Sequence, residues 1–186
     1  SAEAALLFGG NKPSLTADTE IWNGTAWTET NNMLTARNGF AGNGTSTSAL
    51  GYGQDDPARS GLTESWNGTS WSEKADLSTV RRQAGGLGAD NESALTFGGE
   101  NTTINLITNT EEWNGSAWTE TGDLNTGRLG MAGTGITTAG LASAGRQVDP
   151  DSLRTETEQW NGSSWSEVNN VNTGRYGLFG SKLNYA

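Results

Sequence analysis

Residues 19–29 read TEIWNGTAWTE, and this phrase returns three more times along the chain. The first Trp of successive copies stands 44 to 47 residues after the previous one, and all eight Trp lie in these copies. Such a constant period indicates an internal structural repeat and not a single irregular domain. The other copies are TESWNGTSWSE at 63–73, TEEWNGSAWTE at 110–120 and TETEQWNGSSWSE at 155–167.

The Asn-Gly pair between the two Trp of each copy predicts a β-hairpin. Asn-Gly is a strong short-range hairpin signal because both residues tolerate positive φ. One strand is expected to end near Trp22 and the next to begin near Trp27.

A second recurring segment follows each Trp pair and is rich in glycine. We expect it to form an innermost strand, where several sheets converge and only small side chains fit. With about four short strands per period, the chain is predicted to be all-β, a four-bladed β-propeller with four-stranded antiparallel blades. The four copies are MLTARNGFAGNG at 33–44, LSTVRRQAGGLG at 77–88, LNTGRLGMAGTG at 124–135 and VNTGRYGLFGSK at 171–182.

A third segment predicts how the ring closes. It follows the glycine-rich segment as SALGYGQ at 48–54, SALTFGGE at 93–100 and AGLASAG at 139–145, but its fourth copy is AALLFGG at 4–10. The N-terminal strand near 4–8 is therefore expected to complete the C-terminal blade beside a strand near 175–180. The predicted single domain spans 1–186, with blades formed by 1–32 together with 171–186, by 33–76, by 77–123 and by 124–170.

These residues resemble the kelch repeat, in which a strand ending in Gly-Gly precedes two spaced aromatic residues. Phe8-Gly9-Gly10 with Trp22 and Trp27 matches this pattern, as does Phe97-Gly98-Gly99 with Trp113 and Trp118. Trp stands where Tyr is usual, the second Gly-Gly becomes Gly53-Gln54 and the fourth becomes Ala144-Gly145. The phrasing is also similar to repeat arrays in bacteriophage and environmental viral proteins, which implies a place on a virion or cell surface.

The composition of the 186 residues argues against several classes of function. Cys and His are both absent, so thiolate ligands, the usual zinc ligand and the usual general base are missing. We expect no metal, no cofactor and no enzymatic activity. The formal net charge of −10 disfavours nucleic acid as a partner, and no apolar run is long enough to predict membrane insertion.

Four arginines recur at one position of the repeat, just before the innermost strand. A ring of guanidinium groups near the mouth of a central channel would bind an anion, a sugar acid or a carboxylate. Alternatively, each pairs with a glutamate of its own repeat and stabilises the scaffold, which we favour because residues common to all repeats usually serve the fold. The arginines are Arg37, Arg81, Arg128 and Arg175, and the glutamates are Glu20, Glu64, Glu111 and Glu158.

The loops between the second and third strands differ in length and charge, at 11–15, 55–59, 100–107 and 146–154. Variable loops on a constant frame are how a scaffold presents a specific surface. Five charged residues in these loops are candidate ligand-binding residues, whereas a calcium site is disfavoured because too few ligands are correctly spaced. They are Asp55, Asp56, Arg59, Asp149 and Asp151.

Two further patterns allow a functional and a structural interpretation. Paired carboxylates such as Glu20 and Glu29 suggest glycoside hydrolysis, but identical residues in every repeat do not supply two distinct environments. The Trp residues would serve as sugar-stacking platforms or, as we favour, fill the space between blades.

The sequence therefore predicts a non-catalytic recognition module that binds a glycan or a protein loop through its loop face, in an extracellular or virion location. The alternative is a structural unit of a larger assembly such as a phage particle, and a glycan-processing enzyme is weaker still. Recognition predicts a concave polar mouth, whereas assembly predicts an exposed apolar patch, for which Ile104, Leu106 and Ile107 are candidates.

Overall fold

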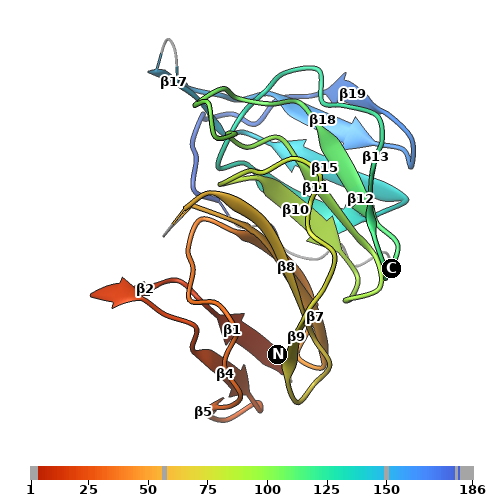
Figure 1. The fold of residues 1–186 in the computed structure, drawn as a ribbon. Helices are drawn as coiled ribbons and strands as arrows, with labels where there is room; N and C mark the ends of the chain where they lie inside the picture. Colours follow the sequence, from red (N-terminus) through yellow and green to blue (C-terminus); the bar gives the residue numbers. More distant parts are fainter. Residues whose placement is uncertain (1–3, 56–57, 149–150, 179, 181–186) are drawn as a thin grey trace.

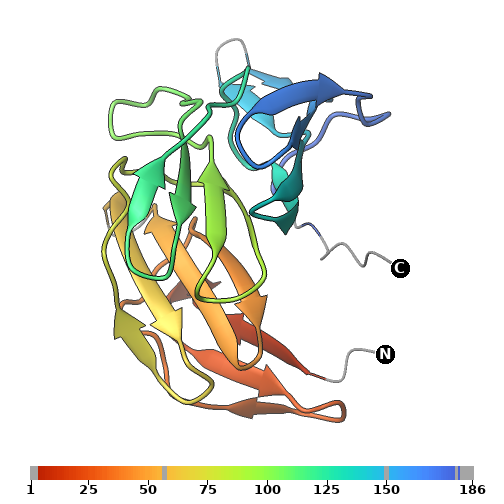
Figure 2. The same cartoon turned by 90° about the vertical axis from the view of Figure 1, so that its right-hand side faces the viewer.

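The computed structural model describes residues 4–55, 58–148, 151–178 and 180. All regular elements in these residues are β-strands, and none of the described residues form a helix long and apolar enough to cross a membrane. Four sheets follow one another along an arc, and two small hairpins project from it (Figures 1 and 2). The prediction of an all-β chain is confirmed.

The first sheet shows how the Trp-Asn-Gly phrase folds. Trp22 ends one strand and lies opposite Trp27, which begins the next. Between them the Asn23 side-chain oxygen accepts hydrogen bonds from the backbone N–H groups of Thr25 and Ala26, at 2.9 and 3.0 Å, and Gly24 has a φ of 94°. The sheet has three strands in the order β1 (Ala5–Phe8), β4 (Thr19–Trp22) and β5 (Trp27–Glu29).

The other three large sheets each have four antiparallel strands. The second sheet contains β6 (Ala41–Thr45), β7 (Ser48–Gln54), β8 (Ser60–Trp66) and β9 (Trp71–Glu73). The third contains β10 (Gly85–Gly88), β11 (Ala94–Phe97), β12 (Thr110–Trp113) and β13 (Trp118–Glu120). The fourth contains β14 (Ala132–Ile136), β15 (Ala139–Ser143), β18 (Thr157–Trp160) and β19 (Trp165–Val168).

The two hairpins extend from the loops between second and third strands. Residues Asn11–Lys12 (β2) pair with Ser14–Leu15 (β3), and Arg146–Val148 (β16) pair with Asp151–Leu153 (β17). Figure 1 shows both projecting to the same side of the molecule, on the left of the view. These two of the four variable loops therefore lie on the same side of the sheets.

The innermost strands pack closely because they are rich in glycine. Strand β10 contacts both β6 and β14. A Cβ atom on Gly133 of β14 would overlap the carbonyl oxygen of Gly86 of β10. Glycine at this position therefore permits the close approach of neighbouring sheets, as the sequence predicts.

Aromatic residues fill the space between neighbouring sheets. Trp66, Trp113 and Trp160 are almost completely buried, which agrees with the packing interpretation of these residues. The second Trp of a sheet packs on an aromatic residue of the preceding sheet at three interfaces, with ring centroids 4.7 to 4.9 Å apart. The pairs are Phe8–Trp71, Tyr52–Trp118 and Phe97–Trp165.

The predicted closure of the ring is not formed by the described residues. β1 pairs with β4 alone, and the first and fourth sheets lie at opposite ends of the arc (Figure 2). Residues 175–178 continue beyond the fourth sheet, where the N–H of Gly145 donates a 2.8 Å hydrogen bond to the carbonyl of Arg175. Only residue 179 of the predicted closing strand at 175–180 lies outside the described residues, and the described residues of that segment form no strand and do not pair with β1, so closure stays a prediction.

Candidate functional site

Three of the four recurring arginines form buried ion pairs. Arg37, Arg81 and Arg128 are fully buried, and each also donates a hydrogen bond to a backbone carbonyl at 2.7 or 2.8 Å. Their guanidinium groups therefore do not reach the surface where they would bind a ligand, and their placement agrees with the scaffold interpretation. The ion pairs are Arg37–Glu64 at 3.0 Å, Arg81–Glu111 at 2.7 Å and Arg128–Glu158 at 2.9 Å.

The partner glutamates link each pair to the chain segment that precedes the arginine. Glu111 accepts hydrogen bonds from the backbone N–H groups of Ser78 and Thr79, at 2.8 and 3.1 Å, as well as from Arg81. Burial lowers the pKa of Arg81, and the charge of Glu111 and its hydrogen bond oppose this effect. Because guanidinium is not deprotonated in proteins, the pair remains ionic.

Arg175 differs from the other three. It is exposed, and no ion pair joins it to another described residue. Glu20, the corresponding glutamate, is half-buried in the first sheet and has no arginine partner in the part of the chain that the structure describes. The predicted ring of four arginines is therefore not assembled by these residues.

The paired carboxylates of the repeats are cross-strand neighbours. Glu64 lies opposite Glu73 and Glu111 lies opposite Glu120. In both pairs the first carboxylate is buried against an arginine and the second is exposed. These contacts give the first carboxylate of each pair a scaffold role.

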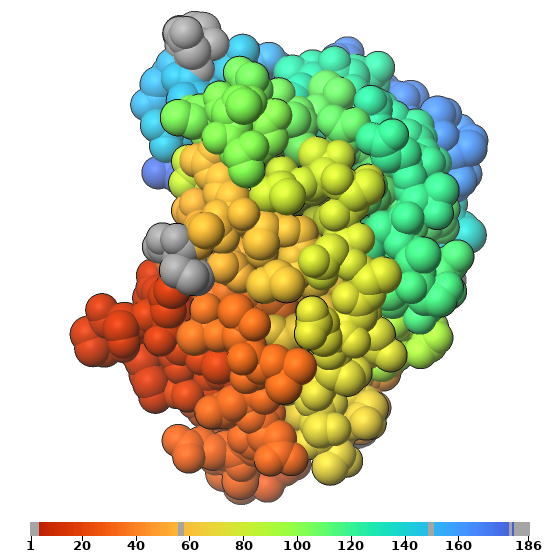
Figure 3. Space-filling model, in the orientation of Figure 1, coloured from red at the N-terminus to blue at the C-terminus, as the bar shows by residue number. Residues whose placement is uncertain are grey.

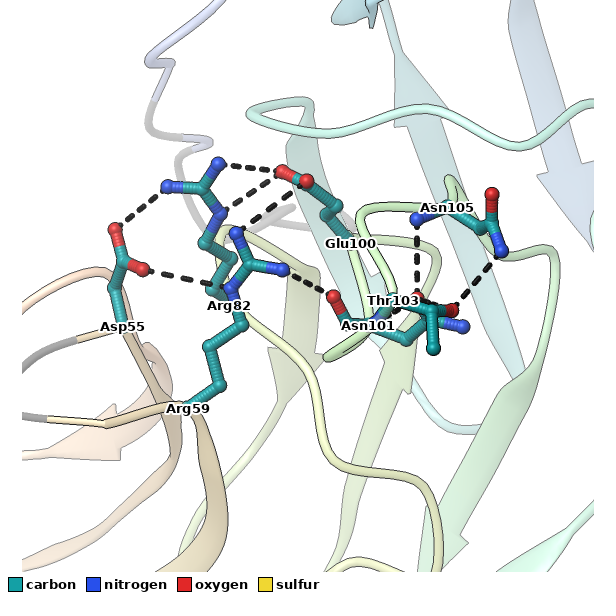
Figure 4. Close-up of polar contacts among 7 residues, drawn as sticks. All are labelled: Asp55, Arg59, Arg82, Glu100, Asn101, Thr103 and Asn105. Carbon is teal, nitrogen blue, oxygen red and sulfur yellow. Dashed lines mark hydrogen bonds and ion pairs between the residues drawn. The ribbon is translucent and has the colours of Figure 1, made fainter.

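A different group of charges lies on the side of the variable loops, and we call it the loop-face cluster. It contains Asp55, Arg59, Arg82 and Glu100 (Figure 4). Asp55 follows β7, Arg59 directly precedes β8, Arg82 lies in the segment leading to β10, and Glu100 follows β11. The cluster therefore joins the second sheet to the third.

Arg82 is held by two carboxylates in the loop-face cluster. Its Nε and Nη2 atoms donate hydrogen bonds to one oxygen of Glu100 at 2.9 and 2.6 Å, and its Nη1 donates to Asp55 at 2.8 Å. Arg59 lies 3.4 Å from the other oxygen of Glu100 and 3.8 Å from Asp55. Arg59 also donates a hydrogen bond to the backbone carbonyl of Asn101.

The cluster combines a buried anchor with partly exposed groups. Glu100 is fully buried, whereas the side chains of Arg82 and Arg59 are 25 % and 18 % exposed. Partial burial would lower the pKa of Arg82, but its hydrogen bonds to Asp55 and Glu100 outweigh this and raise the pKa. Arginine is not deprotonated in proteins, so both guanidinium groups are charged. Their contacts fix them in position, and the N–H groups that these contacts leave unused can donate hydrogen bonds to a carboxylate or a hydroxyl group.

The turn beside the cluster is also ordered by side-chain hydrogen bonds. The Asn101 side-chain oxygen accepts hydrogen bonds from the backbone N–H groups of Thr103 and Asn105, both at 3.0 Å, as Figure 4 shows. Ile104 at its tip is 64 % exposed, whereas Ile107 is buried. In Figure 3 the segment around these residues stands at the upper left, on the side from which the hairpin of residues 11–15 projects.

The remaining predicted loop residues do not join the cluster. Asp56 and Asp149 lie outside the described residues. Asp151 pairs with Arg146 at 2.7 Å, and the Arg146 guanidinium lies 5.2 Å from the ring centre of Tyr176. Asp151 therefore belongs to a separate charged contact at the fourth sheet.

The inner strands face an open central space of about 870 Å³. Leu6, Phe8 and Phe40 contribute to its lining from one end of the arc, and Met131 and Tyr176 from the other. This space is bounded by the two ends that the predicted ring would join.

The sequence prediction included Asp55 and Arg59 but missed Arg82 and Glu100. Arg82 follows the recurring Arg81, and the residues at its position in the other repeats are Asn38, Leu129 and Tyr176. The signal that could have revealed Arg82 was its charge, since the residues at its position in the other repeats are uncharged. It was hidden by the neighbouring arginine, which does recur.

Comparison with known proteins bears on the fold alone. No protein-family model matches the chain, and no curated protein sequence matches it. A solved structure described as "Structure of YjhT" superposes with a TM-score of 0.76 at 12 % sequence identity, over 96 % of this chain and 71 % of that chain. This likeness and the succession of antiparallel sheets show a β-propeller-like fold.

Proposed function

We propose that this protein is a non-catalytic recognition module that binds a glycan or a protein loop at the loop-face cluster. One observation carries the proposal: the loop-face cluster combines a buried carboxylate with two partly exposed arginines and occurs once among the residues that the structure describes. The recurring arginines Arg37, Arg81 and Arg128 are instead buried in ion pairs with glutamates. A non-repeated, pre-positioned charged group on a repetitive scaffold is suited to specific binding.

The loops around the cluster support this role. The segments at 11–15, 55–59, 100–107 and 146–154 differ in sequence while the sheets that hold them are alike. Their described parts lie on one side of the molecule (Figure 1). A ligand seated on the cluster would therefore contact residues that have no equivalent elsewhere in the chain.

The chemistry of the cluster favours a ligand with a carboxylate or several hydroxyl groups. Arg59 and Arg82 supply planar donors whose orientation is fixed by Glu100, and guanidinium groups match carboxylates in a bidentate manner. A sugar acid or an acidic protein loop meets this requirement. The net charge of −10 disfavours a polyanion such as nucleic acid, since repulsion would act over the whole surface.

The proposal includes a propeller of kelch-like blades on an extracellular or virion surface. Its first blade would be completed by an innermost strand from a segment near 175–180, of the same chain or of a second copy, beside β1. Support comes from the repeat, because each of the other three large sheets begins with such a strand. Support for a non-catalytic role comes from the recurring carboxylates, since Glu64, Glu111 and Glu158 are bound by arginine.

A glycan-array screen of the purified protein tests the proposal, with acidic peptides as a second probe set. The test variant is the double substitution Arg82→Gln with Glu100→Gln, which removes both charges and keeps hydrogen-bonding side chains in place. Lys74→Gln is the matched control, because Lys74 is an exposed cation after β9. We expect binding of an acidic glycan or peptide that the control retains and the double variant loses.

Two results would count against this assignment. Binding that is equal in the double variant would place the site elsewhere on the molecule. Binding to neither probe set would favour the second candidate function, a structural unit of a larger assembly. The observation in favour of that candidate is the exposure of large apolar side chains at the ends of the arc, including Leu7 and Trp27.

A further inference from the structure

Neighbouring sheets are joined by the same hydrogen bond at three interfaces. The second Trp of the later sheet donates its indole N–H to the hydroxyl of a buried threonine in the preceding sheet, at 3.0 Å each time. Each sheet therefore has a leading face, which carries the Trp, and a trailing face, which carries the Thr. The bonds are Trp71–Thr19, Trp118–Thr63 and Trp165–Thr110.

The donor and the acceptor for a fourth hydrogen bond of this kind lie at the two ends of the arc. Trp27, on the leading face of the first sheet, is 47 % exposed, whereas Trp71, Trp118 and Trp165 are buried. At the other end, the hydroxyl oxygen of Thr157 is buried without a hydrogen-bond partner among the described residues. Buried hydroxyl groups are almost always hydrogen-bonded, so this oxygen indicates a missing donor.

Apolar residues at both ends are also less covered than their equivalents. Leu7 in β1 is 58 % exposed, although the residues at its position in the other sheets, Gly51, Thr96 and Ala142, are buried. Val171 is half-buried, whereas Met33, Leu77 and Leu124 at its position are buried. Both ends therefore expose surface that is covered wherever two sheets meet within the chain.

The charges at the two ends are complementary. Arg175 is exposed on the trailing end and Glu20 is half-buried on the leading face. Their equivalents form the three buried pairs, with Arg81 and Glu111 2.7 Å apart. The ends thus carry the two halves of a fourth ion pair.

A chain of backbone hydrogen bonds also stops at the trailing end. The N–H of Gln83 donates to the carbonyl of Gly39, that of Gly130 to Gln83, and that of Gly177 to Gly130, at 2.7 to 2.8 Å. All four residues have positive φ, from 49° to 70°, so this is one repeated conformation. To continue the series, the N–H of a second Gly39 would donate a hydrogen bond to the carbonyl of Gly177.

We infer that a second copy of this chain supplies the missing neighbour. The trailing end of one copy, with Thr157, Arg175 and Gly177, docks on the leading face of the other, with Glu20 and Trp27. The contact is heterologous, which means that it joins different surfaces of the two copies. One leading face and one trailing end therefore remain available for the next contact. This inference goes beyond the recognition role and does not depend on it.

A second copy fits these ends better than the chain's own opposite end. The first and fourth sheets lie at the two ends of an open arc (Figure 2). To meet within one chain they would have to rotate all three interfaces, each of which contains a buried ion pair and an aromatic contact. Close-packed interfaces resist such changes, whereas docking a second copy needs none.

The first test measures the mass of the protein in solution by analytical ultracentrifugation over a range of concentrations. We expect wild-type protein to self-associate and Leu7→Lys to be monomeric, because a charge then occupies the leading face. Leu34→Lys is the control, since Leu34 is similarly exposed, at 62 %, in the segment after the first sheet. Wild-type protein that is monomeric throughout would overturn the inference.

The second test separates contact between copies from closure within one chain. Glu20→Arg and Arg175→Glu each place like charges at the contact, so each variant alone is expected to be monomeric. Mixing the two restores one native and one reversed ion pair, and mixed oligomers should form. If mixing restores nothing while the double variant within one chain regains wild-type thermal stability, the chain closes on itself and the inference is wrong.

These outcomes are separate from those of the ligand-binding test. None of Leu7, Glu20 and Arg175 belongs to the loop-face cluster. A protein that binds its ligand and stays monomeric contradicts only the contact between copies, and one that associates without binding contradicts only the recognition role.

Discussion

The indole N–H of Trp71 donates a 3.0 Å hydrogen bond to the hydroxyl of Thr19, which belongs to the preceding sheet. Both residues come from the recurring phrase that begins with Thr and contains two Trp. The phrase therefore specifies a hairpin within one sheet and, at the same time, the attachment of that sheet to its neighbour. A repeat whose stability depends on its neighbours is typical of such arrays.

Replacing Thr19 with Val should destabilise the protein. The substitution keeps the shape of the side chain but leaves the buried indole N–H of Trp71 without an acceptor, which costs about 1–3 kcal/mol. Urea denaturation measures the loss. Thr25→Val, in the exposed turn of the first sheet, is the control and should change stability by less than about 0.5 kcal/mol. Equal midpoints for Thr19→Val and wild type would show that the bond between sheets contributes nothing.

Gly133→Ala should destabilise the innermost strands. Its Cβ would overlap the carbonyl oxygen of Gly86, and a backbone atom cannot turn aside as a flexible side chain does. Overpacking of this kind costs about 1–3 kcal/mol, measurable by thermal or urea denaturation. Thr138→Ala, at an exposed turn after β14, provides the comparison. A Gly133→Ala protein as stable as that control would mean that the inner strands lie further apart.

Much of the fold follows from the repeated residues. Asn-Gly between Trp22 and Trp27 predicts the turn, and the Asn23 side chain forms the hydrogen bonds that such a turn needs. The glycine-rich segments predict innermost strands such as β10, and the period predicts the succession of sheets. These features were predictable because each is repeated, so that one physical requirement is visible several times.

The candidate site was less predictable for the same reason. Glu100 and Arg82 form part of the loop-face cluster through contacts between different repeats, and neither residue recurs in a periodic pattern. Asp55 and Arg59 were found only because their loop differs from the others. The sequence also did not predict whether the chain ends contact each other or a second copy, because Glu20 and Arg175 can form an ion pair in either case.

Acid should weaken the contact around Glu156. Burial would raise the pKa of Glu156, but hydrogen bonds from its own segment and the neighbouring Arg154 outweigh this and lower it. A lowered pKa in the folded state means that the carboxylate stabilises the fold above its unfolded pKa and that this contribution is lost as pH falls through the folded pKa.

NMR titration of the Glu156 carboxyl group measures this directly, and we expect a midpoint below its ordinary value of 4.5. Arg154→Gln should move the midpoint upward, because it removes a charge and a hydrogen bond that favour the ionised form. A midpoint at or above the ordinary value in wild-type protein would contradict the ion pair between Arg154 and Glu156, whose side chains are 2.6 Å apart.

Arg81→Met should be strongly destabilising. Arg81 is fully buried, and its removal leaves Glu111 buried without its cation. Breaking a buried pair in this way costs about 3–5 kcal/mol. Chemical denaturation should show the loss, with Lys74→Met as an exposed cation for comparison. A protein close to wild type in stability would contradict the structural role of the recurring arginines.

A substitution at Arg82 tests most directly the central claim that the loop-face cluster binds a ligand. Arg82 is assigned to ligand binding, whereas the adjacent Arg81 is assigned to the scaffold. The measurement is an isothermal titration of the ligand found by screening into wild-type protein and into the folded Arg82→Gln, Glu100→Gln variant. We predict that the variant binds at least about tenfold more weakly, a loss of about 1.4 kcal/mol, while its circular dichroism spectrum is unchanged. Equal affinity of the two proteins would contradict recognition through the loop-face cluster.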